Sequence, residues 1–412
     1  MFQSHWPRWL TRSLSLSGLL ATIGFTYCVV NPDVLSPWLY SSHYHGLFLD
    51  LLGRINNLKQ LHEIGNIYLW NGPEAFTYPP GAIIFFWPLH ALSFRFWQYF
   101  SVFASLSSLA LTFTILLHKF RNLTWPVAVT VGLWASVLLA AFYPPVMSDL
   151  IWGNISTVIF ATTVLDYFVV PQRYRGALVG LTAAIKIYPI IFIVWWAWRR
   201  QWREVRNAIA SSAALTFVAA CIWWPSAHTF VTTQVLGGVE LHRFRATSLN
   251  SSSIMAFFSR PPFHPGDGSL LVVGGISLVI LTLSFRGAAH LLSENHPWSA
   301  FIVLSIGMRV VMPIAWDHYF VFIPFTFFII LELGARAPLS RISFAVLGLM
   351  TLPWVFLRVS HSIPTTAIQA IVNFFEQNII LGLMVAMVIV SNLFWRPSTS
   401  LAASSSKDSA HG

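Results

Sequence analysis

Phe76-Thr77-Tyr78-Pro79-Pro80 marks the point at which this chain changes character. Before it, a loop of about 45 residues, from Asn31 to Ala75, is rich in polar side chains. After it, apolar runs follow one another almost to the C-terminus. Loops of this length are uncommon unless they carry a function or are disordered, so the long first loop indicates a functional element.

The composition of the 412 residues identifies the class of protein. Hydrophobic residues make up 56% and charged residues only 9%, whereas a soluble domain carries about 25% charged residues. The mean hydropathy is +0.66. We therefore predict an all-α, polytopic membrane protein surrounded by lipids. Cys28 and Cys221 both fall in apolar runs, which argues against a disulfide framework or a Cys-based zinc site.

The net charge of +10 raises the question of a nucleic-acid partner. Lys and Arg occur in short runs between the apolar segments. Positive charge that flanks apolar helices is a topology signal of membrane proteins. No nucleic-acid partner is therefore expected.

The apolar runs predict roughly ten full membrane spans, each needing about 20 apolar residues, and two broken or re-entrant segments. Arg8 and Arg12 precede the first run without a cleavage site, which indicates an uncleaved signal anchor with its N-terminus inside and the long loop outside. Residues 1–396 are interpreted as one integral-membrane domain and residues 397–412 as a disordered cytoplasmic tail. The predicted spans are 14–30, 97–117, 124–147, a segment after residue 154 that ends near residue 170, 207–224, 269–285, 298–312, 319–333, 342–356 and 378–395.

Two shorter apolar runs, 79–94 and 176–198, allow two topologies. If both runs cross the membrane, the cations between residues 119 and 175 lie outside, against the positive-inside tendency. If both runs dip in and return, those cations lie inside and only Arg95 lies outside. Pro189 and the prolines at the start of the first run suit broken helices, so we prefer the re-entrant topology.

Asp50 is the candidate catalytic base. Among the 14 acidic residues, those inside apolar sequence weigh most, because ionised groups near a membrane face are costly unless they are exposed or partnered. Asp50 follows Leu47-Phe48-Leu49 and precedes Leu51-Leu52, a pattern that predicts a helix along the membrane interface with the carboxylate aimed into a site. Alternatively, Asp50 only pairs with Arg54, since residues i and i+4 share a helix face.

Asp317 and His318 stand at the predicted outer end of a span. Such a pair can set an imidazole tautomer or bind a phosphate when protonated. Alternatively, Asp317 is an N-cap that interacts with the helix dipole. Arg309 lies about two helical turns inward, where a buried guanidinium needs an anionic partner.

Lys186 lies in the middle of an apolar run, where an unpaired ammonium is costly. It either serves a site or snorkels to an interface. Arg243 and Arg245, with His242, form a basic cluster in a predicted outer loop. This cluster suits lipid headgroups or a lipid-linked phosphate.

The chain shows no phosphate-binding loop, dinucleotide fingerprint or zinc-ligand spacing. No cofactor is therefore expected. The pattern requires no metal, and it leaves open a divalent ion near Asp149 or Asp317.

Seven motifs follow one another along the chain. They are Asp50, Gly65-Asn66-Ile67-Tyr68, Phe76–Pro80, Trp152-Gly153-Asn154, Ala183–Pro189, Asn250–Ser253 and Trp316-Asp317-His318-Tyr319. In this order they resemble the motifs of glycosyltransferase family 87, a membrane-embedded family of the GT-C superfamily that contains the mycobacterial phosphatidylinositol mannoside mannosyltransferases. The resemblance covers about residues 46 to 325, although the family commonly has Val-Tyr after its aspartate where this chain has Leu51-Leu52.

The resemblance implies a glycosyltransferase that uses a sugar carried on polyprenyl phosphate. The acceptor is a glycolipid or lipoglycan, and transfer takes place at the outer face of the plasma membrane with Asp50 as general base. It favours mannose, α-1,2 transfer and inversion of the anomeric carbon. The expected donor-phosphate residues are His318, Lys186, Arg309, Arg243 and Arg245, and the expected substrate-positioning residues are Tyr78, Asn154, Asn250, Asp317 and Tyr319.

Two alternatives remain at this stage. An arabinofuranosyltransferase of the same fold would use decaprenyl-phosphoryl arabinose. A transporter of lipid-linked sugars would carry out no chemistry, but a transporter places its key charges near the bilayer midplane. Most acidic residues of this chain fall in predicted outer loops, which favours an enzyme.

Overall fold

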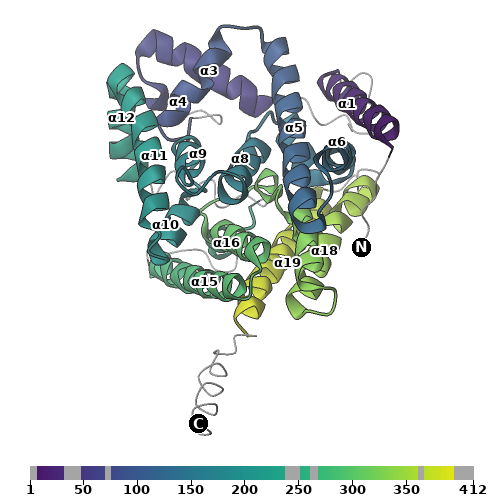
Figure 1. Ribbon diagram of the computed structural model, residues 1–412. Coiled ribbons are helices and arrows are strands. Elements are labelled where there is room, and N and C mark those ends of the chain that lie inside the picture. The colour runs from purple at the N-terminus through teal and green to yellow at the C-terminus, as the bar shows by residue number, and fades with distance from the viewer. Residues whose placement is uncertain are drawn as a thin grey trace, which may run out of the picture.

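The computed structural model describes residues 7–31, 48–69, 76–236, 251–259, 268–360 and 366–393. Within these ranges the regular elements are helices (Figure 1), and the β-pairing is an isolated antiparallel bridge between Ser251 and Trp316. The prediction of an all-α membrane protein is confirmed. The predicted tail, 397–412, lies outside the described residues.

Within the described part of the chain, five helices are long and apolar enough to cross a membrane. A sixth candidate is the pair α7 and α8, which bend by 113° at the turn between them. The five helices are α1 (Arg8–Val30), α5 (Phe94–Arg121), α6 (Trp125–Phe142), α11 (Trp202–Ile222) and α15 (Gly268–Ser293), and the bent pair is α7 (Pro144–Ile151) with α8 (Ser156–Phe168).

Further apolar helices complete the bundle. The predicted ten to twelve membrane segments require these to be counted as well, so the number of spans stays a prediction. They are α4 (Gly81–Phe86) with the 3-10 turn η2 (Trp87–His90), α16 (Pro297–Val311), α17 (Phe327–Leu333) with the preceding 3-10 turns η4 (Asp317–Phe320) and η5 (Ile323–Thr326), α18 (Pro338–Ser360) and α19 (Thr366–Leu393).

Two predicted spans are divided in the structure. The run 124–147 is broken after α6, because Tyr143 is extended and is followed by Pro144 and Pro145, which lack a backbone N–H. The run 319–333 is two 3-10 turns and a short helix rather than one α-helix. Both irregular segments come to lie at the functional site.

The run 176–198 is the broken pair that the sequence predicts. α9 (Ala177–Ile185) ends at Lys186, whose backbone is extended, and α10 (Ile190–Trp198) begins after Pro189. The residues just before α9 lie beside the first half of α11, where the Asn207 side-chain amide donates to the Arg175 carbonyl at 2.9 Å. α10 ends just before α11 begins. The pair therefore enters and returns at one end of α11, the path expected of a re-entrant element.

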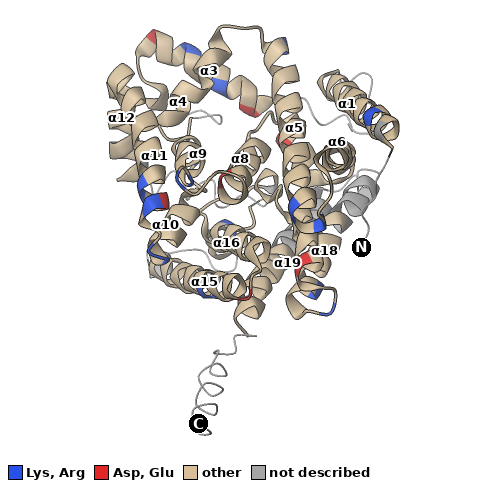
Figure 2. Ribbon diagram, viewed as in Figure 1, with Lys and Arg blue, Asp and Glu red and all other residues tan. Residues whose placement is uncertain are grey.

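α3 (Leu49–Ile64) itself carries Arg54 and Lys59, but many of the cationic side chains lie at helix ends away from it (Figure 2). Figure 2 shows Lys and Arg around α10 and the start of α11, at the end of α5 and in the loop before α18, while α3 lies across the opposite end of the bundle. This separation agrees with the re-entrant topology, in which these cations face one side of the membrane. The position of the membrane itself stays a prediction.

One face of α3 packs against the helical bundle. Leu51, Ile55, Leu58 and Leu61 are buried at helical spacing. Their side chains belong to the main hydrophobic core. The predicted interfacial helix is thus a helix packed on the bundle, with Asp50 in its first turn.

Smaller elements complete the described fold. They are η1 (Ile67–Leu69) after α3, α12 (Trp224–Thr229) with the π-helix η3 (Phe230–Val235) after α11, and α14 (Ile254–Phe258) before α15.

Candidate functional site

The start of α3 is docked on the turn between α7 and α8. The Phe48 and Leu51 amides donate to the carbonyls of Ile151 and Trp152 at 2.6 and 3.3 Å. Gly153 in this turn has a φ of +64°, and a Cβ there would lie 2.8 Å from the Cβ of Leu51. A side chain at Gly153 would therefore strain the backbone and push α3 away.

This docking places Asp50 beside Asn154. The Asp50 Oδ2 accepts a hydrogen bond from the Asn154 amide nitrogen at 2.5 Å and lies 3.5 Å from Arg54 Nη2. The Asp50 side chain is 36% exposed. Within the described residues, Oδ1 accepts no hydrogen bond. One oxygen is thus fixed and the other is open to a reactant.

The sequence allows Asp50 to pair with Arg54 instead of acting as a base. The structure contains this pair, and the pair is compatible with a catalytic role for Asp50. The guanidinium is buried, and it donates to the Gly153 carbonyl and to the Tyr78 hydroxyl, each at 2.7 Å. It also lies over the ring of Phe86, 4.9 Å from its centroid. Burial raises the pKa of Tyr78, although Arg54 opposes the shift. Tyr78 is therefore a neutral phenol at physiological pH.

The Gly65–Tyr68 motif sets the position of Tyr78. The Tyr68 hydroxyl donates to the Tyr78 carbonyl at 2.7 Å. Asn66 accepts from the Tyr68 amide at 3.1 Å and donates to the Thr229 hydroxyl of α12 at 2.7 Å. This motif therefore acts as a support for the Phe76–Pro80 element rather than as a part of the reactive surface.

Asn154 is the centre of the polar network. Its Oδ1 accepts from Lys186 Nζ at 2.9 Å and from the Ile155 amide at 2.7 Å. Because an ammonium only donates, the Asn154 nitrogen must be the atom that faces Asp50 and, at 3.0 Å, His318 Nε2. Nε2 of His318 is then an acceptor, so the imidazole is neutral and carries its proton on Nδ1.

Lys186 is buried at the α9–α10 break. Its Nζ also donates to the Ser156 hydroxyl at 2.9 Å and lies 4.2 Å from the Tyr319 ring centroid. Among the described side chains it forms no ion pair with a carboxylate. The snorkelling alternative is wrong, because only 4% of the residue is exposed. The site thus contains a buried ammonium held by neutral groups.

Arg309 is the third buried cation of the described residues, after Arg54 and Lys186. The guanidinium lies 3.8 Å from the centroid of Tyr188 and 5.0 Å from that of Tyr319, and 2% of the residue is exposed. The described side chains provide no carboxylate partner for it, in contrast to the expected anion. Aromatic ring faces, which attract cations, surround it instead.

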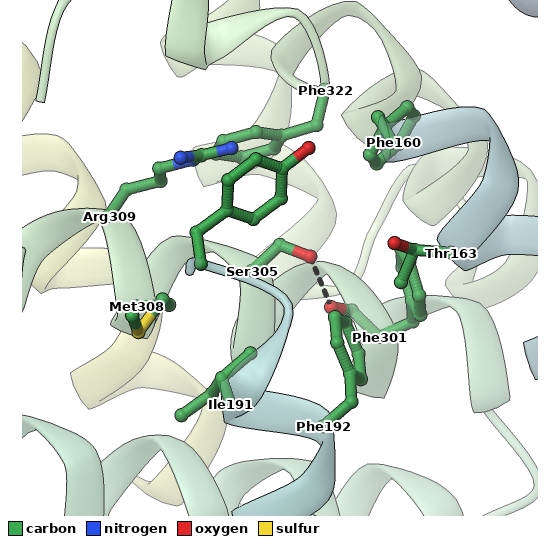
Figure 3. Close-up of a pocket in the computed structure, with 10 residues that line it drawn as sticks. Phe160, Thr163, Ile191, Phe192, Phe301, Ser305, Met308, Arg309 and Phe322 are labelled. Atoms are coloured by element: carbon green, nitrogen blue, oxygen red, sulfur yellow. Dashed lines mark hydrogen bonds between the residues drawn. The ribbon is translucent and has the colours of Figure 1, made fainter. Parts of the chain in front are cut away.

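A small cavity adjoins this cation (Figure 3). The cavity is about 10 Å³, room for about one water molecule. Figure 3 shows Arg309 beside Phe322 on one wall, with Ser305 and Thr163 facing the space. The Ser305 hydroxyl already donates to the Phe301 carbonyl at 3.0 Å. The cavity is too small for a sugar. Arg309 can therefore contribute its positive charge to the site but does not contact a sugar through this cavity.

Comparison with known proteins gives the family. Residues 76–314, more than half of the chain, match the model of glycosyltransferase family 87. The chain belongs to glycosyltransferase family 87. It is a glycosyltransferase and a multi-pass membrane protein, so the alternative of a transporter without chemistry is set aside. The matched residues begin at Phe76, after Asp50.

Two relatives are similar to this family 87 chain over most of its length. A polyprenol-phosphate-mannose-dependent alpha-(1-2)-phosphatidylinositol mannoside mannosyltransferase of Mycobacterium tuberculosis is 27% identical over 302 residues, 68% of this chain and 67% of the relative. The corresponding pentamannoside mannosyltransferase of Mycolicibacterium smegmatis is 25% identical over 371 residues, 84% of this chain and 82% of the relative. No solved structure matches the chain.

Asp149 has a structural role in this family 87 enzyme. Its carboxylate accepts from the amides of Ser156 and Thr157 at 3.0 and 3.1 Å and from the Thr157 hydroxyl at 2.8 Å. It therefore caps the N-terminus of α8, where a negative charge is favourable. No group of three His, Cys, Asp or Glu side chains capable of holding a metal occurs within the described ranges.

The structure brings together most of the predicted site. One network of polar contacts joins Asp50, Asn154, Lys186 and His318, and Arg54 links Tyr78 to Asp50. The ring of Tyr319 and the guanidinium of Arg309 stack beside this network. Arg243, Arg245 and Asn250, and the side chain of Asp317, lie outside the described residues. Ser251, which follows Asn250 in sequence, pairs with Trp316 next to the η4 turn.

Two further residues contact the site but were not selected as candidates from the sequence. Ser156 forms part of an Asn-x-Ser tripeptide with Asn154, a pattern too common to interpret, yet both residues hold Lys186. Tyr188, two residues after Lys186, stacks on Arg309. The only sequence feature that could have indicated Ser156 and Tyr188 is that each lies two residues from a candidate site residue.

Proposed function

We propose that this enzyme transfers mannose from polyprenyl-phosphate mannose to a hydroxyl of a glycolipid or lipoglycan of the phosphatidylinositol mannoside type. The main support for this proposal is the Asp50 carboxylate, which has one hydrogen-bonded oxygen and one open oxygen. It lies in the same site as two buried cations, Lys186 and Arg309. The names of the family 87 relatives supply the donor and the acceptor class.

In this mechanism Asp50 Oδ1 accepts the proton of the acceptor hydroxyl. The hydroxyl oxygen forms a bond to the anomeric carbon as the bond from that carbon to the phosphate oxygen breaks. The electron pair of the breaking bond leaves with the polyprenyl phosphate. A β-linked donor and one displacement give an α product, so the anomeric carbon is inverted. A base within hydrogen-bond reach of the nucleophile lowers the barrier by proton transfer in the transition state.

The cations support departure of the phosphate. Nδ1–H of His318 is the donor that the Asn154 contact leaves available, and it is proposed to bind a phosphate oxygen. Lys186 and Arg309, both buried, add positive charge behind it. Fixed charge of this kind requires no reorganisation when the leaving group becomes anionic, and the proposed reaction uses no cofactor.

We place the reaction at the outer face of the plasma membrane. Asp50 lies on α3, across the end of the bundle opposite the cationic helix ends (Figure 2). Cytoplasmic loops are the ones enriched in Lys and Arg. The end that carries α3 is therefore the extracytoplasmic one.

The test is transfer of radiolabelled sugar by the purified enzyme in lipid vesicles. Polyprenyl-phosphate mannose and decaprenyl-phosphoryl arabinose are offered in parallel, with phosphatidylinositol mannosides as acceptor. The proposal expects a new α-1,2-linked mannose, identified by linkage analysis. Transfer from the arabinose donor alone would show that the donor assignment is wrong, and a retained anomeric configuration would overturn the single displacement.

A further inference from the structure

Arg54 and Asp50 do not form an ordinary surface ion pair. Arg54 is 3% exposed, whereas the Asp50 side chain is 36% exposed. In an exposed i, i+4 pair both charges are hydrated and the pair contributes little. Here the guanidinium is fixed by a carbonyl and a phenol at 2.7 Å each, and the carboxylate is farther away, at 3.5 Å.

Arg54 is held in place by partners from other segments. Tyr78 accepts its hydrogen bond and lies under it, 5.2 Å from the guanidinium to the ring centroid. Tyr68 in turn holds the Tyr78 carbonyl. On the opposite side the Gly153 carbonyl fixes the other end of the guanidinium. The charge is therefore in position whether or not the carboxylate turns towards it.

We infer that Arg54 is a positioning residue for the base, and that the hydroxyl of Tyr78 is the group that aims it. Arg54 and Asn154 both face the Oδ2 atom of Asp50. Two donors on one oxygen limit rotation of the carboxylate, and Oδ1 stays turned to the open side. A small misplacement of a reacting group can cost a large factor in rate, so this restraint acts on the chemical step.

This inference rests on the proposed function, because it assigns a role to the surroundings of the proposed base. A purely structural role of Arg54 would be to fasten α3 to the α7–α8 turn. The two roles differ in what they affect. Fastening α3 changes stability and the amount of active enzyme, whereas positioning changes the turnover of correctly folded enzyme.

Tyr78→Phe separates the two roles without removing a buried charge. The ring and its packing remain, and only the hydroxyl that binds Arg54 is lost. We expect kcat to fall about tenfold, with the KM of donor and acceptor each within about twofold of wild type. The matched control is Tyr99→Phe, since Tyr99 also bonds a side chain, Asn31 at 2.9 Å, and lies under an arginine, Arg95. It lies outside the network of Asp50 and is expected to leave kcat unchanged.

Asp50→Asn provides the second arm. Single-turnover transfer with excess enzyme measures the residual rate of Asp50→Asn and of Asp50→Asn with Tyr78→Phe. Positioning through the base predicts that Tyr78→Phe has no further effect when the base is absent. An unchanged kcat in Tyr78→Phe, or an equal loss in both backgrounds, would overturn the inference. Absence of any transfer by wild type would count against the proposed function instead.

Discussion

Two carboxylates of this enzyme lie near one another in the network and have opposite surroundings. Asp149 is fully buried, and its two oxygens accept three hydrogen bonds at the start of α8. Asp50 is 36% exposed and uses one oxygen, with the other unbonded among the described residues. A carboxylate whose oxygens are already occupied can cap a helix, but only one with an open oxygen can take a proton from a substrate.

Lys186 connects these two regions. Its ammonium bonds Asn154, which bonds Asp50, and it also bonds Ser156, whose amide bonds Asp149. The comparison thus separates two functions within one network.

Asp50→Asn should have the largest effect on transfer. We expect a loss of about 10²- to 10⁴-fold in turnover, since the amide cannot accept the proton. The melting temperature should stay near that of wild type. Glu63→Gln, an exposed change at the other end of the same helix, is the control for transfer at matched expression. Wild-type turnover in Asp50→Asn would place the base elsewhere.

Asp149→Ala should show the reverse pattern. It removes a cap and leaves two buried amides without an acceptor, a loss of about 2–4 kcal/mol in the free energy of unfolding. Thermal unfolding in detergent measures this loss. Transfer per folded molecule should fall much less than in Asp50→Asn. A stable Asp149→Ala protein without transfer would make Asp149 the better candidate for the base.

Lys186→Gln tests the residue that connects the surroundings of Asp50 and Asp149. The glutamine can still donate to Asn154, but the positive charge is lost. We expect the donor KM to rise by about tenfold or more, because hydrogen bonds to charged groups are worth more than neutral ones, while the acceptor KM changes little. Titration of both substrates in the vesicle assay checks this. Equal increases in both KM values would indicate a general disturbance of the site.

Arg309→Lys should have a smaller effect. Charge is retained, but stacking of the planar guanidinium on Tyr188 is lost. We expect a three- to tenfold decrease in kcat/KM for the donor, in line with a cation–π contribution of about 1 kcal/mol. The same donor titration measures it. An Arg309→Lys enzyme identical to wild type would confine Arg309 to a packing role.

The smallest effect is expected from Glu63→Cys, which tests the side of the membrane. This exposed position lies on α3, so activity should stay within about twofold of wild type. On intact cells, a membrane-impermeant maleimide should label it. The wild-type enzyme, with Cys28 and Cys221 in apolar helices, is the control. Labelling only after lysis would reverse the predicted orientation.

Much of the fold was predictable because it follows from local sequence. Apolar runs identified the membrane helices, Pro189 identified the break at Lys186, and the apolar surroundings of Asp50 identified a helix in the first loop. The division of the run 124–147 was missed, although Pro144 and Pro145 are visible in the sequence. Hydropathy alone does not separate one span from two helices that meet at an angle.

The site could be predicted only in part, because its contacts join distant segments. Asp50 and Asn154 are 104 residues apart, and Asn154 and His318 are 164 residues apart. Residue type and position in the sequence indicated each of these residues as a site candidate. They did not indicate which of the residues form hydrogen bonds with one another. Arg54 was identified as a neighbour of Asp50 on one helix face, while its bond to Tyr78 depends on how α3 packs against the Phe76–Pro80 element.

The central claim is that the open oxygen of Asp50 accepts the acceptor proton. Its most direct test is transfer by Asp50→Ala with and without added formate, a small carboxylate that can enter the space left by the side chain. The account predicts near-complete loss of transfer and a concentration-dependent recovery with formate, which Asp149→Ala should not show. Transfer by Asp50→Ala at the wild-type rate without formate would contradict it.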